Sequence, residues 1–188
     1  MWARLESNTI KEILIRPKAL TIGGVQYPSN IFSMWSNSEL AVIGIVPVEQ
    51  DNTNLKDKQY YINTAQSYTY NTETGKATAS YGTATALPLA DSGSGDSLVK
   101  GLKSKHKDII NQQAGVILQD TDWMVIRAAE GGTAVPGATT TWRAAVRTKA
   151  NSMQAQIDGA ANVDALAALY IYNSETPPVR PLGEFPTL

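Results

Sequence analysis

Polar and apolar side chains alternate over short segments in the first part of the chain, which predicts strands rather than helices. Two hairpins are indicated, each with a pair of turn formers between its strands: residues 2–5 and 10–15 around Ser7-Asn8, and residues 19–22 and 25–27 around Gly23-Gly24. A glycine pair supplies the positive φ values that a two-residue type I′ turn requires, so the second hairpin has the sharper signal.

Two short helices and a third β region complete the predicted N-terminal domain, residues 1–88. Apolar residues at helical spacing predict helices over residues 29–35 and 38–44, the second capped by Ser38. Strands are predicted over residues 60–62, 67–70 and 77–81, with a turn at residues 71–75. The longest apolar run, residues 40–48, contains Gly44 and Pro47 and is too short to span a bilayer.

Three tyrosines in this β region are candidates for an assembly surface. Tyr68, Tyr70 and Tyr81 lie on threonine-rich segments that suit half-exposed strands. Tyrosine is enriched at interfaces because it offers a large rigid area with a polar tip.

A small, polar, glycine-rich segment, residues 89–96, is predicted to be a flexible linker to a helical domain, residues 97–172. Apolar side chains recur there at helical spacing. The pattern predicts helices over residues 97–119, 122–130 and 140–158, and a last short helix capped by Asn162. The domain would be a helical hairpin with two short braces. Trp35, Trp123 and Trp142 fall at apolar positions of predicted helices, which favours places in the core.

The last residues, 173–188, are predicted to form an extended tail that is either free or lies against a partner. Four prolines in the final twelve residues prevent the tail from continuing a helix or entering a sheet. Its candidate contact residues are Pro177, Pro178, Arg180 and Phe185. The predicted fold class is therefore α+β: a β-rich hairpin domain with short helices, a small helical hairpin domain and an extended proline-rich tail.

Composition excludes several partners and sites. With 188 residues and 43% apolar side chains, the chain can build a core. Its net charge of −1 gives no general attraction to nucleic acid or to an anionic membrane. No apolar leader or spanning segment is present, so we expect a soluble protein in the cytoplasm that makes it, without membrane insertion. The absence of cysteine excludes disulfides and thiolate chemistry.

The residues that could carry catalysis are few. His106, the sole histidine, lies among lysines and is interpreted as a residue at the edge of a helix face. Asp120 and Asp122 come where a helix should start, which favours capping over metal binding. Glu73 and Asp91 are exposed acids without a paired carboxylate, as a glycoside hydrolase would need. The sequence thus predicts a protein that is not an enzyme and holds no cofactor and no metal.

A motif within residues 117–147 resembles the phage tail assembly chaperone-like module. That module typically reads Leu-Leu-x-x-Thr-Asp-Trp, then a proline-bearing loop, then a helix with an aromatic residue, an arginine and a second arginine one turn on. The matching residues here are Thr121, Asp122, Trp123, Pro136, Trp142, Arg143 and Arg147. The module usually has tyrosine where this chain has Trp142.

The resemblance implies a structural component of the virion tail, an adaptor or a small tail-fibre or baseplate subunit, made in the host cytoplasm. Its partners would be other phage tail proteins and its own copies, as a trimer or hexamer, and contact with the host surface stays open. The alternative is a tail-fibre assembly chaperone that is absent from the mature virion. Trp123 and Trp142 would lock two helices together. Arg143 and Arg147 would pair with Asp120 or Asp122, or face a partner.

Overall fold

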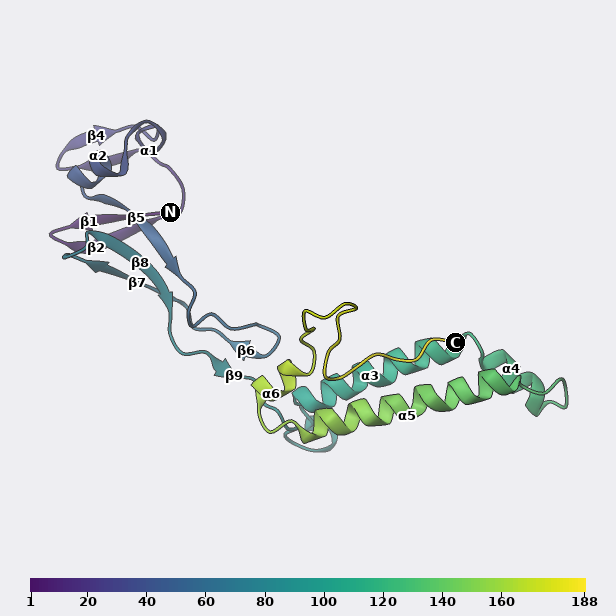
Figure 1. Ribbon diagram of the computed structural model, residues 1–188. Coiled ribbons are helices and arrows are strands. Elements are labelled where there is room, and N and C mark those ends of the chain that lie inside the picture. Colours follow the sequence, from purple (N-terminus) through teal and green to yellow (C-terminus); the bar gives the residue numbers. More distant parts are fainter. The chain divides into compact units, whose positions relative to one another are not determined.

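The computed structural model describes residues 1–188, which divide into two units, Met1–Thr85 and Ala86–Leu188 (Figure 1). The first unit holds a curled five-stranded sheet and two short helices, and the second is helical. This mixture confirms the α+β fold class. No helix has the length and apolar character needed to cross a membrane.

The sheet of the first unit is built around a strand that the sequence pattern did not predict. Its order is β2-β1-β5-β8-β7, with bounds β1 Trp2–Glu6, β2 Thr9–Leu14, β5 Ile45–Asp51, β7 Gln66–Asn71 and β8 Lys76–Tyr81. The central strand β5 pairs antiparallel with β1 as far as Pro47, and parallel with β8 from Val48 onward. Pro47, which has no amide hydrogen, therefore lies where β5 exchanges one neighbour for the other.

The predicted hairpins are confirmed, because their turns have the required backbone. Ser7 and Asn8 have φ values of 50° and 60°, and Gly23 and Gly24 have 58° and 82°. Strands β3 (Leu20–Ile22) and β4 (Val25–Tyr27) flank the glycine pair. The turn between β7 and β8 closes through the Gly75 amide, which donates to the carbonyl oxygen of Asn71 at 2.9 Å. A further two-stranded pairing joins β6 (Tyr61–Ile62) and β9 (Thr85–Ala86).

One face of the sheet is covered by the β3–β4 hairpin and by helices α1 (Ile31–Met34) and α2 (Asn37–Val42). The buried residues of this layer are Leu14, Leu20, Ile31, Leu40 and Ile45. Trp35 packs against them, as predicted for the core, and its ring meets that of Tyr27 edge-on with centroids 5.8 Å apart.

The prediction that Ser38 caps α2 is wrong. The cap is Ser36, whose hydroxyl accepts the Glu39 amide while the Glu39 carboxylate accepts the Ser36 amide. This capping box requires an acid three residues after the serine, and Ser36 has that residue whereas Ser38 does not.

The other face of the sheet encloses a second, smaller cluster around Ala3, Val46 and Ala77. The edge strands β2 and β7 come into contact with each other, so the sheet curls around this cluster. Ala3, Ala77 and Ala79 are 0% exposed. Their small side chains leave room for the curl.

In the second unit, α3 (Leu102–Gln119) and α5 (Gly137–Gly159) form an antiparallel hairpin, with α4 (Asp122–Ala129) at the connecting end and α6 (Val163–Ala168) after it (Figure 1). The helices occupy the predicted segments, although α3 begins five residues later than expected. Asn162 caps α6 as predicted by accepting the Ala165 amide. Apolar side chains of α3, α5 and α6 form the core: Leu102, Ile110, Ala114, Val146, Ala150, Met153, Ile157, Val163 and Leu166.

The segment predicted as a linker, residues 89–96, belongs to the second unit and has local structure of its own. The Asp91 carboxylate accepts the Gly101 amide at 2.8 Å and the Ser104 hydroxyl at 2.8 Å, just where α3 begins. These hydrogen bonds lower the pKa of Asp91. A short 3₁₀ turn covers Gly95–Ser97.

The last residues do not form a free tail. After a loop over residues 173–179, residues 180–188 run along the helices of their own unit (Figure 1). Leu182 is 0% exposed, and its amide donates to the Leu169 carbonyl oxygen at 3.0 Å. The expectation of a tail that is free or held by a partner is therefore corrected. The prolines prevent helix formation, but they do not prevent a leucine between them from being buried.

We predict that Gly44→Ala destabilises the first unit by about 2 kcal/mol, because Gly44 has a φ of +77° and an added Cβ would lie 2.9 Å from the Leu5 carbonyl oxygen. Gly75→Ala is the matched control, with a φ of +66° and nothing within 4 Å, and should cost about 1 kcal/mol. Urea unfolding of both variants measures the difference. Equal losses would show that the Leu5 contact contributes nothing.

Candidate functional site

The motif residues meet at the connecting end of the helical hairpin, around Arg143 of α5. Arg143 is 7% exposed. Its guanidinium donates to the Leu118 carbonyl oxygen at 2.8 Å, to the Thr121 hydroxyl, and to the Asp122 carboxylate at 2.6 Å. The C-terminal carbonyl groups of a helix have no partner within the helix, and here an arginine from the neighbouring helix supplies one to α3. The predicted internal salt bridge is confirmed, with Asp122 as the partner and not Asp120.

Arg147 does not share this role. It lies one turn along α5, is exposed, and has no hydrogen-bond or ion-pair partner. The expected pair of arginines is thus divided: Arg143 joins the helices, and Arg147 remains available to solvent or to another molecule.

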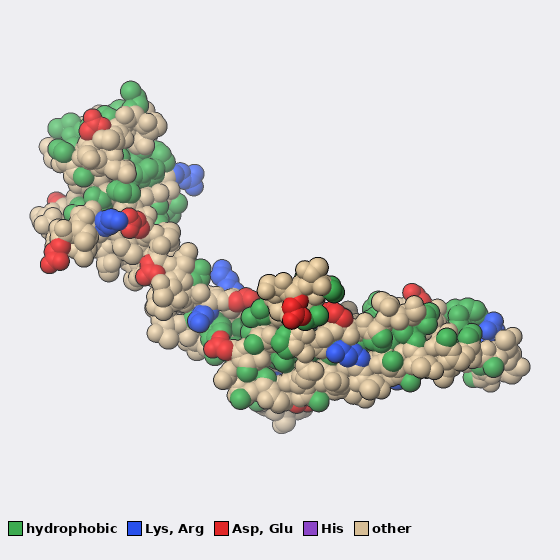
Figure 2. Space-filling model, in the orientation of Figure 1, with side chains coloured by type: hydrophobic (Ala, Val, Ile, Leu, Met, Phe, Trp, Pro, Cys, Tyr) green, Lys and Arg blue, Asp and Glu red, His purple; other side chains and the backbone are tan.

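The two tryptophans of the motif also differ. The prediction that Trp123 lies in the core is wrong, because its side chain is 53% exposed and carries the Arg127 guanidinium 4.8 Å from the ring centroid. None of the residues of α4 is buried, although the helix includes Trp123, Val125 and Ile126. The reason is position: α4 lies at the end of the hairpin, where no other helix covers it. Figure 2 shows hydrophobic side chains on the surface over this end.

Trp142 is partly buried and contacts the end of the chain rather than Trp123. Its indole Nε1 donates to the Pro186 carbonyl oxygen at 2.9 Å. The expectation that the two tryptophans lock the helices together is therefore not met. Arg143 makes that connection instead.

The candidate tyrosines share one side of the sheet. Tyr68, Tyr70 and Tyr81 are directly opposite Ala79, Ala77 and Gln66 in the β7–β8 ladder, and all three are half-buried. Tyr70 packs against the cluster inside the curl, and the Tyr68 hydroxyl donates to the Gln66 amide oxygen at 3.2 Å. Part of each ring thus stabilises the sheet, and an assembly role for the remainder stays a prediction.

The candidate residues of the last segment mostly contact their own unit. The Arg180 guanidinium pairs with the Glu184 carboxylate at 2.8 Å and lies over the rings of Tyr172 and Tyr170. The Tyr172 hydroxyl donates to Glu184 at 2.6 Å, and this hydrogen bond raises the pKa of Tyr172. Phe185 is half-buried beside α3. Pro177 and Pro178 are exposed in the loop.

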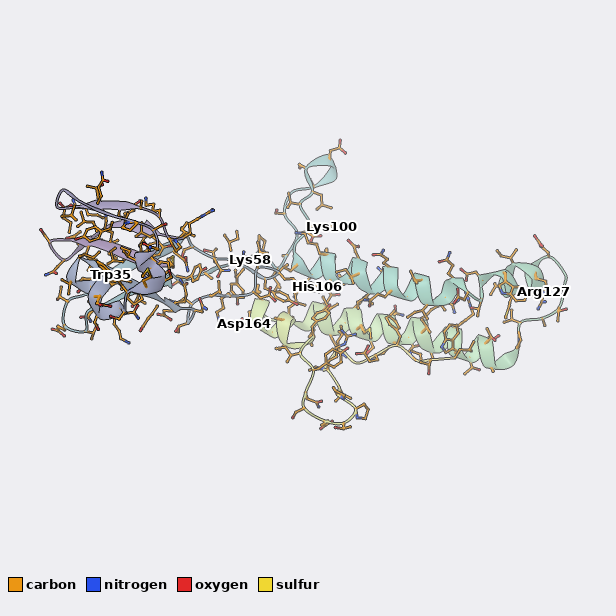
Figure 3. The ribbon with its side chains drawn as sticks, turned by 90° about the horizontal axis from the view of Figure 1, so that it is seen from above. Trp35, Lys58, Lys100, His106, Arg127 and Asp164 are labelled. Carbon is orange, nitrogen blue, oxygen red and sulfur yellow. The ribbon has the colours of Figure 1, made fainter.

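His106 is not at the edge of a helix face, as expected, but inside the helical unit at 3% exposure (Figure 3). Its Nδ1 lies 2.8 Å from the Tyr170 hydroxyl, and burial lowers its pKa. Two of the lysines around it in sequence, Lys103 and Lys107, reach across to Asp158 of α5, and periodicity alone did not place the imidazole. No group of three or more histidine, cysteine, aspartate or glutamate side chains is arranged to hold a metal ion.

Comparison of the chain with protein-family models, with curated proteins and with solved structures found no significant match. The resemblance of residues 117–147 to the phage tail assembly chaperone-like module therefore stays a hypothesis. To this resemblance the structure adds two observations: the hydrogen bonds around Arg143 and the exposed end of the helical hairpin.

We predict that Arg143→Ala lowers the free energy of unfolding by about 2–3 kcal/mol, because it leaves the Thr121 hydroxyl and the end of α3 without their donor. The half-exposed Asp122 can be hydrated, which limits the loss. Arg147→Ala is the matched control on the same helix and should change stability by less than about 0.5 kcal/mol. Chemical denaturation measures both, and similar effects would contradict the assigned role of Arg143.

We predict that stability falls as the pH drops below the ordinary histidine pKa of 6.5, because burial holds the pKa of folded His106 below that value. The unfolded chain then binds more protons, and unfolding becomes easier by at most about 1.4 kcal/mol per pH unit until the folded pKa is passed. His106 is the sole histidine, so His106→Gln should remove the dependence between pH 7 and 5. Thermal melts of both proteins over this range test it, and an unchanged slope in the variant would refute it.

Proposed function

We propose that this chain is a non-enzymatic structural component of a phage tail, an adaptor or a small tail-fibre or baseplate subunit, that works through protein–protein contacts. One observation carries the proposal. Thr121, Asp122 and Arg143, three residues of the module-like motif, form a single cluster that fixes the end of the helical hairpin. Part of the motif therefore meets in space, although its residues lie on different helices, and this supports the resemblance.

The end that this cluster fixes has the character of an interaction surface. Trp123, Val125 and Ile126 project from α4 without burial, and exposed apolar side chains gathered on one short element commonly mark a contact with another protein. In this proposal the β-rich domain docks to the particle or to its own copies. The helical domain with its last segment engages neighbouring chains in a trimer or hexamer. The chain is made in the host cytoplasm and resides in the virion tail, and contact with the host surface is compatible with this placement.

The alternative is a tail-fibre assembly chaperone that leaves before the virion is complete. It is favoured by the same exposed α4, because a chaperone needs an apolar surface for an unfinished fibre. A complete β-rich unit favours the structural subunit, since a chaperone does not need one. The last segment no longer separates the two, because it lies on its own helices.

The deciding measurement is mass spectrometry of gradient-purified particles, with this chain quantified against the major tail proteins. We expect a fixed copy number that is a multiple of three or six, by the resemblance to tail proteins. A host cytoplasmic protein quantified in the same sample controls for contamination. Absence from particles combined with presence in the lysate would overturn the structural role in favour of the chaperone.

A further inference from the structure

Residues 180–188, named here the terminal segment, lie over the seam between α3 and α5. Glu184 and Phe185 line a hollow with Gln113 and Val116 of α3, and Glu184 and Pro186 line another with α5. The Trp142 indole donates to Pro186, and Leu182 is completely buried. The terminal segment thus occupies this surface as a bound peptide would.

The seam is selective for the segment that lies on it. Leu182 fills a buried position, and Gly183 follows it with a φ of +74°. Residues that carry a side chain rarely adopt this backbone conformation, so the segment favours glycine directly after the leucine. An unrelated peptide seldom meets both conditions, whereas every copy of this chain does.

The loop before the terminal segment is a clasp with its ends held together. The Asn173 amide donates to the Val179 carbonyl oxygen at 2.8 Å, and the Val179 amide donates to the Asn173 side-chain oxygen at 2.9 Å. Residues 173–179 are all exposed. Opening the clasp breaks few contacts, and seven extended residues reach roughly 23 Å, enough to place the terminal segment on a neighbouring molecule.

An apolar surface surrounds the base of this clasp. Ile171, Tyr172 and Val179 are exposed and line a shallow hollow together. If terminal segments pass between molecules, the connecting loops of two copies meet at the base of the clasp. The exposed apolar side chains there then become covered. An exchange between copies would explain why these apolar side chains are exposed in the single chain.

We propose that copies of this chain associate by exchanging terminal segments, each seating Leu182 and Gly183 on the α3–α5 seam of another copy. The terminal segment makes the same contacts on the seam of its own chain and on the seam of another copy. The free-energy difference between the single chain and the exchanged form therefore comes from the opened clasp and from the apolar surface that exchange covers. Exchange from each chain to the next closes a ring, as a trimer or hexamer requires. The inference rests on the self-association in the proposed function.

Cysteine crosslinking on purified chain tests this, because the protein has no cysteine of its own. Phe185→Cys is introduced in one chain and Val116→Cys in another, two positions that line the same hollow. The two chains are coexpressed, purified together and treated with a short bifunctional maleimide. We expect a crosslinked heterodimer in good yield. Phe185→Cys paired with Glu73→Cys, an exposed turn residue of the first unit, measures random collision and should give little product.

Two further variants make the test decisive. Asn173→Ala removes the side-chain hydrogen bond of the clasp and should raise the yield of crosslinked heterodimer several-fold. Leu182→Asp in the Phe185→Cys chain should abolish it, with circular dichroism confirming that the helices persist. A yield no higher than that of the collision control, or an oligomer that Leu182→Asp leaves unchanged, would overturn the exchange. Absence of the chain from particles would refute the virion role and leave the crosslinking result standing.

Discussion

The buried guanidinium of Arg143 is the constraint on which the helical unit depends. Two antiparallel helices can slide along their common seam, since apolar side chains such as Val146 and Met153 give attraction without a fixed register. Arg143 restricts this sliding because it must reach a carbonyl group in the last turn of α3, a hydroxyl and a carboxylate together. Once the register of α3 and α5 is set, the start of α4 is fixed, and its apolar side chains lie exposed at the end of the hairpin. The seam that receives the terminal segment is fixed by the same contact.

The elements that the sequence predicts well are those whose signal is local. The Gly23-Gly24 turn, the Asn162 cap and the long helices each depend on residues within a few positions of one another, and the structure has them all. Strand β5 was missed because it is central and its first half is buried on both faces. Its apolar residues therefore form a run instead of an alternation, with Pro47 inside it.

The candidate site was predictable only in part. An internal salt bridge from Arg143 and Arg147 to Asp120 or Asp122 was expected, and the structure has the Arg143–Asp122 pair. Whether a tryptophan at an apolar helical position is buried depends on what covers that helix, and the sequence around Trp123 has no signal for the lack of a neighbour. The burial of Leu182 and His106 likewise depends on residues far along the chain, such as Leu169 and Tyr170. The local pattern of polar and apolar residues does not predict such long-range contacts.

The change of partners along β5 has a consequence for the order in which the first unit can fold during synthesis. The β1–β2 hairpin emerges from the ribosome early and can form alone, and β5 can add to it once residue 47 is available. The parallel pairing with β8 closes a long loop and must wait for residues 76–81. Until then Val46 and Ala3, which are fully enclosed in the finished sheet, lie on an open face. Nascent chains at this stage would be the ones most exposed to aggregation.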